Sequence, residues 1–473
     1  MCGIIGIITK DRQISFDLYN SLLNLQHRGQ DNAGIFTADD ENQYMVKGKG
    51  LVAEVFNIEK LETLKGSIGI GQVRYPTTVG KSDSQPFYED VSGIALAHNG
   101  NLCNEASLRD RLKENRIYCD SDCDAETILK VFTYYFNRKK GTVEKRCFTA
   151  AKKAMQKLDG SYSVVAVIRD VGFFAFRDPH GIRPFVFGKK TDKGKVQAYV
   201  FSSESVAIES IVDSIDNVKP GEAMFIDKNL KFKRKLLLPK KRRHCMFEWV
   251  YFSRSISILQ KRYVNEVRGK LGQNLAKIYK ETPLFKRLSK EKRSNIIVAP
   301  IPETSRPASI IFAEKCKYPY KDILEKNRFI GRIFIKPSET LRRHEIAINV
   351  KVINGIVKDK IVILIDDSIV RGTTSKGIVQ KIREKGAKEV HLFSTCPPIT
   401  YPCFYGVDFP DPKELIAYNK KLKEIEDYIG ADSIVYMDIK GLTKAIGFKE
   451  SQLCMACLNG KLPTPLNRVV ESL

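Results

Sequence analysis

The sequence predicts an α/β protein built from two unlike parts. Residues 1 to about 230 combine short apolar, strand-like runs with helical stretches, which is typical of an α+β arrangement. From about residue 255, strands and helices alternate, and this pattern favours a parallel, doubly wound sheet. The chain has 473 residues, 43% of them hydrophobic, so it is long enough for two or three domains with large cores.

The elements of the first part follow from apolar runs of strand length and from helical spacing. In the second helix, for example, Ile128, Val131, Phe132 and Tyr135 fall on one face. Strands are expected at Gly3–Ile8, Ser67–Tyr75, Gly93–Ala97, Tyr162–Ile168 and Ala198–Ser202, and helices at Phe16–Gln26 and Ala125–Phe136.

The second part repeats a strand, a loop and a helix. Each strand is a short apolar run, and each helix begins a few residues after a strand ends. Strands are expected at Ile296–Ala299, Lys360–Ile365 and Val390–Ser394, and helices at Arg262–Tyr279, from Pro307 onward and at Thr374–Lys385.

A basic segment, Lys231–His244, separates the two parts. It contains eight Lys or Arg residues and no acid, which could indicate nucleic-acid binding. No aromatic residues alternate with the charges as single-strand binding requires, so we interpret it as a solvated strand end and linker. The net charge of +24 favours anionic partners in general and does not choose among them.

Several classes of protein are excluded by composition. No apolar run approaches the roughly 18 residues that a membrane span needs, and charges at Lys10 and Arg12 interrupt any signal-peptide pattern. Eleven cysteines without such a signal indicate reduced thiols, metal ligands or a nucleophile. We therefore expect a cytoplasmic protein that binds neither membrane nor nucleic acid.

Cys2 follows the initiator Met, and a small second residue permits removal of that Met. Cys2 would then combine a thiol with an α-amino group of pKa near 8, which can act as its base. The following strand, Gly3–Ile8, contains glycines, which we interpret as allowing close approach of a ligand. Taken alone, a Cys at this position is more often an ordinary thiol than a nucleophile.

Four further segments accompany Cys2: Gln26–Asp31, Val73–Thr77, Ala97–Asn101 and Ser121–Glu126. This set closely resembles the class II glutamine amidotransferases, whose glutaminase domain uses an N-terminal Cys nucleophile. The resemblance implies an N-terminal-nucleophile fold, an αββα sandwich. Its catalytic residues would be Cys2 with the oxyanion donors Asn99 and Gly100, and its glutamine-binding residues Arg74 for the carboxylate and Asp124 for the ammonium.

The segment Ile361–Thr374 is an apolar strand that ends in two acids and leads through a glycine loop into a helix. Ligands bind at such strand ends, and N–H groups at a helix start can hold a phosphate. The segment resembles the signature of type I phosphoribosyltransferases, which bind phosphoribosyl pyrophosphate (PRPP). The resemblance implies PRPP contacts from Asp366, Asp367, Ser368, Arg371, Gly372, Thr373 and Thr374.

Two more segments resemble loops of the same family. Val298–Ser305 resembles the pyrophosphate loop and Lys326–Arg332 the flexible loop that closes over PRPP, which adds Thr304 and Lys326 to the expected contacts. The expected Mg²⁺ ligands are Thr304, Asp366 and Asp367. Ala347 and Asn349 stand where relatives have basic residues, which weakens the expected grip on pyrophosphate.

Nearly the whole chain resembles the amidophosphoribosyltransferases of purine synthesis, with Phe247–Arg254 as their linker. The resemblance implies a glutaminase domain at 1–235, a junction at 236–260 and a phosphoribosyltransferase domain at 261–473. It also implies a homo-oligomer, dimer or tetramer, inhibited by purine nucleotides. Two alternatives are another glutamine-dependent synthase, such as that of glucosamine 6-phosphate, and a PRPP- or nucleotide-sensing regulator on the same fold.

Four of the eleven cysteines match the ligands of a 4Fe–4S cluster found in one branch of this family. They are Cys245, Cys403, Cys454 and Cys457, the last two forming a C-x₂-C pair. Structural zinc is the rival, since it also accepts four thiolates. The other thiols are interpreted as core or loop residues.

Overall fold

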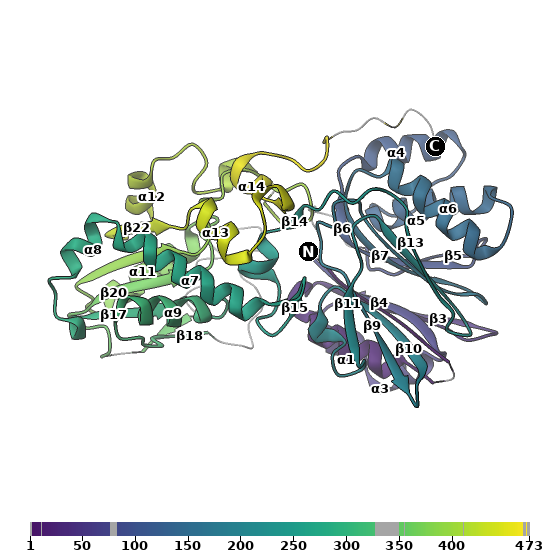
Figure 1. Cartoon of the computed structure of the whole chain (residues 1–473), viewed down its shortest axis with the longest axis horizontal. Helices are drawn as coiled ribbons and strands as arrows, with labels where there is room; N and C mark the ends of the chain where they lie inside the picture. Colours follow the sequence, from purple (N-terminus) through teal and green to yellow (C-terminus); the bar gives the residue numbers. More distant parts are fainter. Residues whose placement is uncertain are drawn as a thin grey trace.

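The computed structural model describes residues 2–10, 12–75, 83–326, 350–353, 355–409, 411–466 and 470. Figure 1 shows two lobes, the first built from β1 to β13 and the second from α7 to the C-terminal segments. In the described part of the chain, no helix is long and apolar enough to cross a membrane.

The first lobe contains a seven-stranded antiparallel sheet in which β1 lies between β10 and β4. Helix α1 packs on β1 and β4, because its buried face presents Leu18, Leu22 and Leu25. The strands in sheet order are β11 (Ser214–Asn217), β9 (Val186–Asp192), β10 (Lys195–Ser202), β1 (Gly3–Thr9), β4 (Ile68–Arg74), β2 (Asn32–Ala38) and β3 (Gln43–Lys49), with α1 (Ser15–Leu25), η1 (Gln26–Arg28), α2 (Val52–Val55), α3 (Ile58–Thr63) and η2 (Ser205–Ala207).

A second antiparallel sheet, of six strands, faces the first. Side chains from both sheets share one core, including Ile4, Phe36, Ala97 and Phe173, while α5 and α6 cover the outer face of the second sheet. The result is an αββα sandwich. The strands are β13 (Phe232–Leu236), β12 (Glu222–Asp227), β8 (Gly172–Arg177), β7 (Gly160–Ile168), β6 (Ile94–Leu102) and β5 (Phe87–Glu89), with α4 (Glu105–Glu114), α5 (Asp124–Arg138) and α6 (Val143–Lys157).

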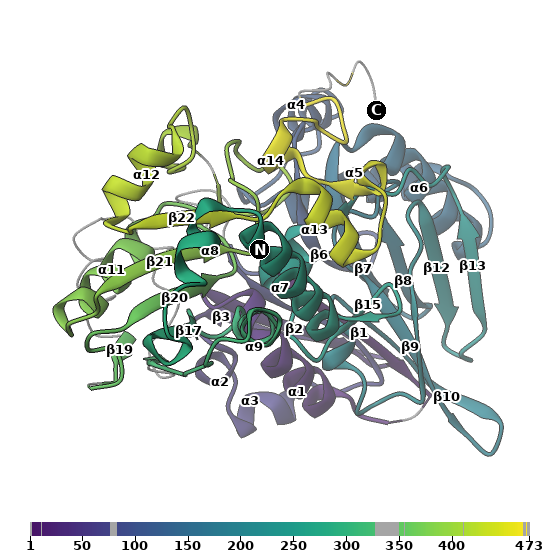
Figure 2. The ribbon, with the colours of Figure 1, turned by 60° about the vertical axis from the view of Figure 1, so that its left-hand side comes forward.

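The second lobe is built on a four-stranded parallel sheet, and Figure 2 shows α7 and α9 on one side of it and α11 and α12 on the other. Alternate residues of β20 enter different cores, Ile363 on one face and Leu364 on the other. The elements are β17 (Ile296–Pro300), β20 (Ile361–Asp366), β21 (Glu389–Ser394), β22 (Ser433–Tyr436), α7 (Val264–Lys280), α8 (Pro283–Leu288), α9 (Arg306–Cys316), α11 (Thr373–Glu384), α12 (Leu422–Ile429), α13 (Ile439–Ile446) and α14 (Ala456–Asn459).

Successive segments of the chain are added to this sheet first on one side of β17 and then on the other. After α9 the chain returns beside β17, where Val298 forms an isolated parallel bridge to Tyr320, while β20 pairs with the other side of β17. Ligands of doubly wound sheets bind at such a switch point, outside the carboxyl ends of the strands. Thr304 follows the end of β17, and Asp366 is the last residue of β20.

Three short pairs complete the structure. The pairs are β14 (His244–Cys245) with β23 (Leu453–Cys454), β15 (Ile258–Leu259) with β16 (Arg262–Tyr263), and β18 (Leu324–Lys326) with β19 (Val350–Val352). Between the lobes lies a short π-helix, η3 (Glu248–Phe252), whose Trp249 is fully buried.

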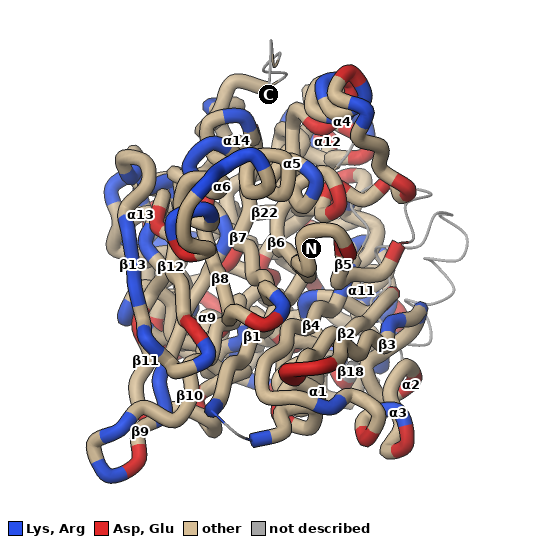
Figure 3. Tube along the Cα trace, turned by 90° about the vertical axis from the view of Figure 1, so that its right-hand side faces the viewer, with Lys and Arg blue, Asp and Glu red and all other residues tan. Residues whose placement is uncertain are grey.

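Every strand and helix predicted from the sequence is present, with ends shifted by a few residues. The basic segment begins as the edge strand β13, and Figure 3 shows its Lys and Arg residues along that edge. Sequence reasoning missed several elements, among them β2, β8 and β12, although β8 and β12 contain apolar runs as long as the predicted strand Ile296–Ala299.

Candidate functional site

Cys2 lies at the start of β1, between the two sheets of the first lobe, and is 5% exposed. Its backbone carbonyl accepts a hydrogen bond of 3.0 Å from Nε of Arg28. Its Sγ lies 4.0 Å from the carbonyl oxygen of Tyr75, directly after β4. The thiol therefore lies where β1 begins and the adjacent strand β4 ends.

The glycines of β1 serve packing and not ligand approach, so that interpretation was wrong. A Cβ at Gly6 would lie 2.4 Å from the ring of Phe173 in the opposite sheet. A Cβ at Gly3 would lie 3.0 Å from Leu25 of α1 and 3.1 Å from Val73. Both positions face neighbouring protein atoms, and small residues there allow the layers to approach.

The expected oxyanion donors lie on β6, in the sheet that faces β1. Asn99 is fully buried, and its Nδ2 donates to Oγ of Ser203 at 3.2 Å. The same Ser203 Oγ accepts from the backbone N–H of Ile4 at 3.0 Å, so it joins β6 to the nucleophile strand. Gly100 has φ of +155°, and a Cβ there would overlap the carbonyl of Ser161. Sequence reasoning missed Ser203, although it directly follows the predicted strand Ala198–Ser202.

Arg74 lies close enough to both Cys2 and Asp124 to interact electrostatically with each of them. Arg74 is buried at the end of β4, and its guanidinium donates to the carbonyl of Asp83. Asp124, the first residue of α5, accepts from the backbone N–H of Leu102 at 3.2 Å. The structure thus brings together the two charges that the sequence assigned to the ends of glutamine.

His98 is a partner of Asp124 that the sequence did not reveal. Its Nε2 lies 3.3 Å from Oδ2 of Asp124. Burial alone would raise the pKa of Asp124, but His98 and Arg74 lower it to about 2. Gln72 is buried and donates to the carbonyl of His98 at 3.2 Å. It therefore supports this arrangement.

The low pKa of Asp124 predicts that glutamine binding resists acid. A carboxyl group with a depressed pKa loses its proton at a lower pH, so Asp124 stays ionised throughout the range from pH 8 to pH 5. The KM for glutamine should therefore change less than about threefold over this range, even where kcat falls. Steady-state glutaminase assays at each pH measure both constants. A tenfold rise in KM by pH 5 would contradict the assignment of Asp124.

In the second lobe, the acids predicted to bind PRPP end β20 beside the loop that follows β17. The hydroxyl of Thr304 donates to Oδ2 of Asp367, and Ser368 Oγ donates to Oδ1 of the same residue at 2.7 Å. Asp366 and Asp367 are each 7% exposed. Burial, and then the charge of Asp367, raise the pKa of Asp366 well above its ordinary value. Such a pair favours a cation between its carboxylates.

The loop after these acids leads into α11, which begins at Thr373. Gly372 has φ of +73°, and a Cβ there would lie 2.3 Å from Ile416, so only glycine fits without rearrangement. Arg371 donates from Nε to Glu414 at 2.6 Å. The N–H groups of Thr373 and Thr374, in the first turn of α11, are suited to an anion.

The expected flexible loop falls only partly within the described residues. Lys326 ends β18, where its backbone pairs with Val350 of β19. The rest of that loop, with the two positions Ala347 and Asn349 that differ from relatives, lies outside the described residues.

The four cysteines predicted to bind a cluster lie near one another at the lobe junction. Cys245 and Cys454 are paired residues of β14 and β23, and the thiols of Cys245, Cys403, Cys454 and Cys457 interact electrostatically. Burial raises the pKa of Cys245 to about 11 and also raises the pKa values of Cys454 and Cys457. Within the residues that the structure describes, no three His, Cys, Asp or Glu side chains are already arranged as metal ligands.

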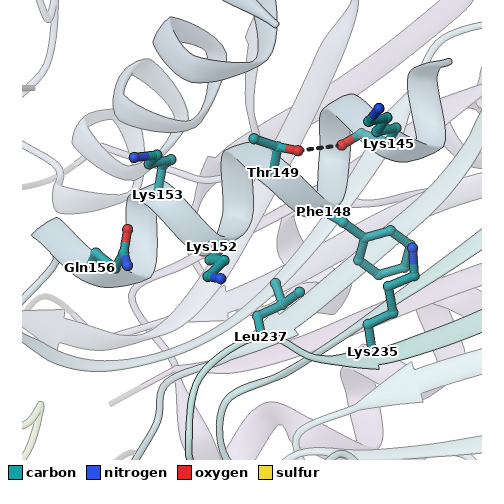
Figure 4. Close-up of a pocket in the computed structure, with 8 residues that line it drawn as sticks. All are labelled: Lys145, Phe148, Thr149, Lys152, Lys153, Gln156, Lys235 and Leu237. Carbon is teal, nitrogen blue, oxygen red and sulfur yellow. Dashed lines mark hydrogen bonds between the residues drawn. The ribbon is translucent and has the colours of Figure 1, made fainter. Parts of the chain in front are cut away.

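A separate pocket of about 350 Å³ lies on the first lobe, between α6 and β13. Figure 4 shows Phe148 and Leu237 beside it, with the amines of Lys152 and Lys235 around them. Lys235 Nζ lies 4.4 Å from the centre of the Phe148 ring. None of the residues predicted to be functional lines this pocket.

These features define the class of protein: a glutamine amidotransferase joined to a phosphoribosyltransferase. The family described as "Glutamine amidotransferase domain" matches residues 73–210. The chain is 39% identical to an amidophosphoribosyltransferase of Methanothermobacter thermautotrophicus, over 98% of this chain and 95% of the relative. It is 38% identical to that of Escherichia coli, over 94% and 89%. The chain belongs to the amidophosphoribosyltransferase family, the enzymes of the first step of purine biosynthesis.

Solved structures agree over the whole length. One is the glutamine phosphoribosylpyrophosphate (PRPP) amidotransferase from B. subtilis, complexed with ADP and GMP. It shows a TM-score of 0.84 and 34% identity, covering 99% of this chain and 98% of that one. A second, titled as the allosteric regulatory enzyme of purine biosynthesis, has the same TM-score and identity. The αββα sandwich and the doubly wound parallel sheet are therefore confirmed.

Proposed function

We propose that this chain converts glutamine, PRPP and water to 5-phosphoribosylamine, glutamate and pyrophosphate. The observation that supports this most directly is the presence of two complementary sites in one chain. Cys2, Asn99 and Arg74 lie together in the first lobe, and the strand-end acids precede an anion-binding helix start in the second. The first lobe supplies ammonia, and the second uses it.

In the glutaminase half, Arg74 binds the carboxylate of glutamine and Asp124 its ammonium group. The α-amino group of Cys2 takes the thiol proton, and Sγ attacks the side-chain amide to form a thioester. Asn99 Nδ2 and the N–H of Gly100 stabilise the negative oxygen that develops. Ammonia leaves, and water then releases glutamate from Cys2.

In the phosphoribosyltransferase half, the Arg371–Thr374 loop binds the 5-phosphate and Lys326 the pyrophosphate. Asp366 and Asp367 accept hydrogen bonds from the ribose hydroxyls, and Thr304 contacts the pyrophosphate. Ammonia attacks C1 of the ribose, and the bond from C1 to the pyrophosphate oxygen breaks. The buried residues Phe247, Trp249 and Phe252 between the lobes exclude water, which would protonate the ammonia.

Mg²⁺ fits the acids at the end of β20. The residues that would hold it are Thr304, Asp366 and Asp367, whose oxygen donors suit this cation. Burial, and then repulsion from the charge of Asp367, raise the pKa of Asp366, and a bound cation would supply the missing counter-charge. When bound, the ion neutralises charge on the departing pyrophosphate.

One experiment tests the whole proposal. The protein is incubated with PRPP and Mg²⁺ together with either glutamine or ammonia, and pyrophosphate release is measured. Release with either nitrogen source supports the proposal. Glutamine hydrolysis that never releases pyrophosphate would favour another synthase, and binding of PRPP without turnover would favour a regulator.

We further propose that Cys245, Cys403, Cys454 and Cys457 hold a 4Fe–4S cluster. The four thiols are neighbours, come from three separate chain segments, and have a donor chemistry suited to iron or zinc. Because they are not yet arranged as ligands, binding requires the thiols to approach each other and lose their protons. A cluster would then fasten the C-terminal segment to the junction, and its binding energy would add to folding stability.

Protein purified without oxygen should be brown and contain about four iron and four sulfide per chain. Each change of a ligand Cys to Ser should lower soluble yield and remove the colour. The matched controls are Cys316→Ser in α9 and Cys119→Ser in the first lobe, which should keep both. A colourless preparation with one zinc per chain would favour the zinc alternative, and metal-free active protein would contradict both.

Three finer points belong to the same proposal. The domain boundaries are placed at 235/236 and 260/261, on either side of the junction. Purine nucleotides are proposed as feedback inhibitors, supported by the ADP and GMP in the Bacillus structure's title. Assembly as a homodimer or homotetramer is proposed from the family, and sedimentation analysis measures it.

A further inference from the structure

Four charged side chains without exposed surface lie between the nucleophile and the segment that joins the lobes. They are Arg28 of η1, Arg183 after β8, Glu204 after β10 and Glu248 at the start of η3. Removing such charges from water is costly unless each is paired and hydrogen-bonded. Their arrangement therefore requires a structural or functional reason.

Glu204 accepts hydrogen bonds from two different directions. Its Oε1 accepts from Arg28 and lies 2.7 Å from Nε2 of His27, both on the nucleophile side. Its Oε2 accepts from the backbone N–H of Arg254 at 2.9 Å and from Oγ of Ser257 at 2.6 Å, both in the linker between the lobes. One carboxylate thus joins η1 to the linker.

Arg28 connects this carboxylate to the nucleophile. Its Nε donates to the carbonyl oxygen of Cys2 at 3.0 Å, while its two terminal nitrogens donate to Glu204 and to both oxygens of Glu248, at 3.0 and 2.8 Å. The guanidinium is planar, so it cannot turn toward one partner without losing another. The position of the Cys2 carbonyl is therefore tied to both carboxylates.

The group is charged at working pH. Burial alone would lower the pKa of Arg28, but Glu248 and Glu204 raise it. Burial alone would raise the pKa of Glu204, but His27 and Arg28 lower it. Because these bonds are charge-assisted, they are stronger than neutral ones and restrict the geometry more tightly.

We propose that Glu204 is a positioning residue for the nucleophile: it holds Arg28 on the Cys2 carbonyl and, through its other oxygen, fixes this contact to the linker at Arg254 and Ser257. The inference rests on the proposed glutaminase function. The Cys2 carbonyl, α-amino group and thiol belong to one residue, so holding the carbonyl sets the direction from which Sγ meets the amide.

The variant Glu204→Gln tests this role. An amide accepts hydrogen bonds at only one of its two positions, so it releases either Arg28 or the linker while keeping the side chain's size.

The kcat for glutamine hydrolysis should fall at least tenfold, with KM for glutamine within about threefold, because Arg74 and Asp124 are untouched. The ammonia-dependent rate should stay within about twofold, and alkylation of Cys2 by iodoacetamide, located by mass spectrometry, should slow at least threefold.

The matched control is Glu222→Gln, which removes the same charge from the ion pair between Glu222 and Arg234. It should leave kcat, KM, the ammonia-dependent rate and the alkylation rate of Cys2 unchanged. An unchanged kcat in Glu204→Gln would overturn the inference. So would an equal loss of the glutamine-dependent and ammonia-dependent activities that matches a loss of folded protein.

A second variant, Ser257→Ala, removes only one linker-side donor and keeps the ion pair. It should lower kcat about threefold at constant KM, and it should also lower the melting temperature because a buried carboxylate loses a donor. An unchanged kcat in this variant would also overturn the inference. Wild-type protein without glutamine hydrolysis would instead refute the proposed function.

Discussion

Replacing Cys2 by Ala should abolish glutamine-dependent synthesis and leave ammonia-dependent synthesis within about twofold of the wild type. Only the first lobe needs a thiol, since ammonia from solution can enter the second site directly. Loss of a covalent nucleophile removes the thioester route, so we expect a fall in glutamine hydrolysis of at least about 1,000-fold. Glutamate and pyrophosphate release, measured in parallel with each nitrogen source, separate the two activities.

The control for this change is Cys119→Ala, which removes a half-buried thiol from the same lobe. It should keep both activities. Mass spectrometry of the wild-type protein should also show a chain that begins at Cys2, because the α-amino base exists only after Met1 is removed. Near-normal glutamine use by the Cys2 variant would show that another group is the nucleophile.

The residues expected at the two candidate sites could be proposed from the sequence because each lies in a short contiguous motif beside or within a predicted strand. Cys2 precedes β1, Asn99 and Gly100 lie within β6, and Asp366 and Asp367 end and follow β20. Local apolar runs locate these strands, and the resemblance of the motifs to known families assigns a role to each residue. Sequence reasoning of this kind does not depend on knowing which strands face each other.

The supporting residues could not be predicted, because their roles depend on contacts between distant segments. Ser203 joins Ile4 to Asn99, and Glu204 joins Arg28 to Ser257, across separations of 53 to 199 residues. The sequence offers one signal of these supporting residues, the polar run Ser202–Ser205 at the end of an apolar strand. That this run is fully buried is seen only in the folded chain.

The error about the glycines of β1 has a similar origin. A glycine in a strand indicates that something approaches closely, and sequence alone does not say whether it is a ligand or another layer of the protein. Here the opposite sheet supplies Phe173 against Gly6, and α1 supplies Leu25 against Gly3. Packing of the αββα sandwich, rather than substrate, explains both residues.

Replacing Asp366 or Asp367 by Asn should weaken PRPP use with either nitrogen source, while basal glutamine hydrolysis survives. These carboxylates lie in the second lobe only, and an amide cannot supply their charge to Mg²⁺ or accept equally from ribose hydroxyls. We expect kcat/KM for PRPP to fall about 100-fold, which corresponds to roughly 2.7 kcal/mol of transition-state stabilisation. Pyrophosphate release at varied PRPP, with saturating glutamine or ammonia, measures the effect.

Asp366→Asn should also change stability in the opposite direction to activity. The pKa of Asp366 is raised in the folded state, so its ionised form costs folding free energy at neutral pH, and this cost diminishes as the pH falls. Removing the charge should therefore raise the melting temperature of the ligand-free protein and reduce the further rise on adding Mg²⁺ and PRPP. Asp427→Asn, an exposed carboxylate on α12, is the matched control and should alter neither. Two results would show that Asp366 does not serve as a charged ligand in the second lobe. One is a variant that loses glutaminase activity alone. The other is a lower melting temperature of the ligand-free Asp366→Asn protein.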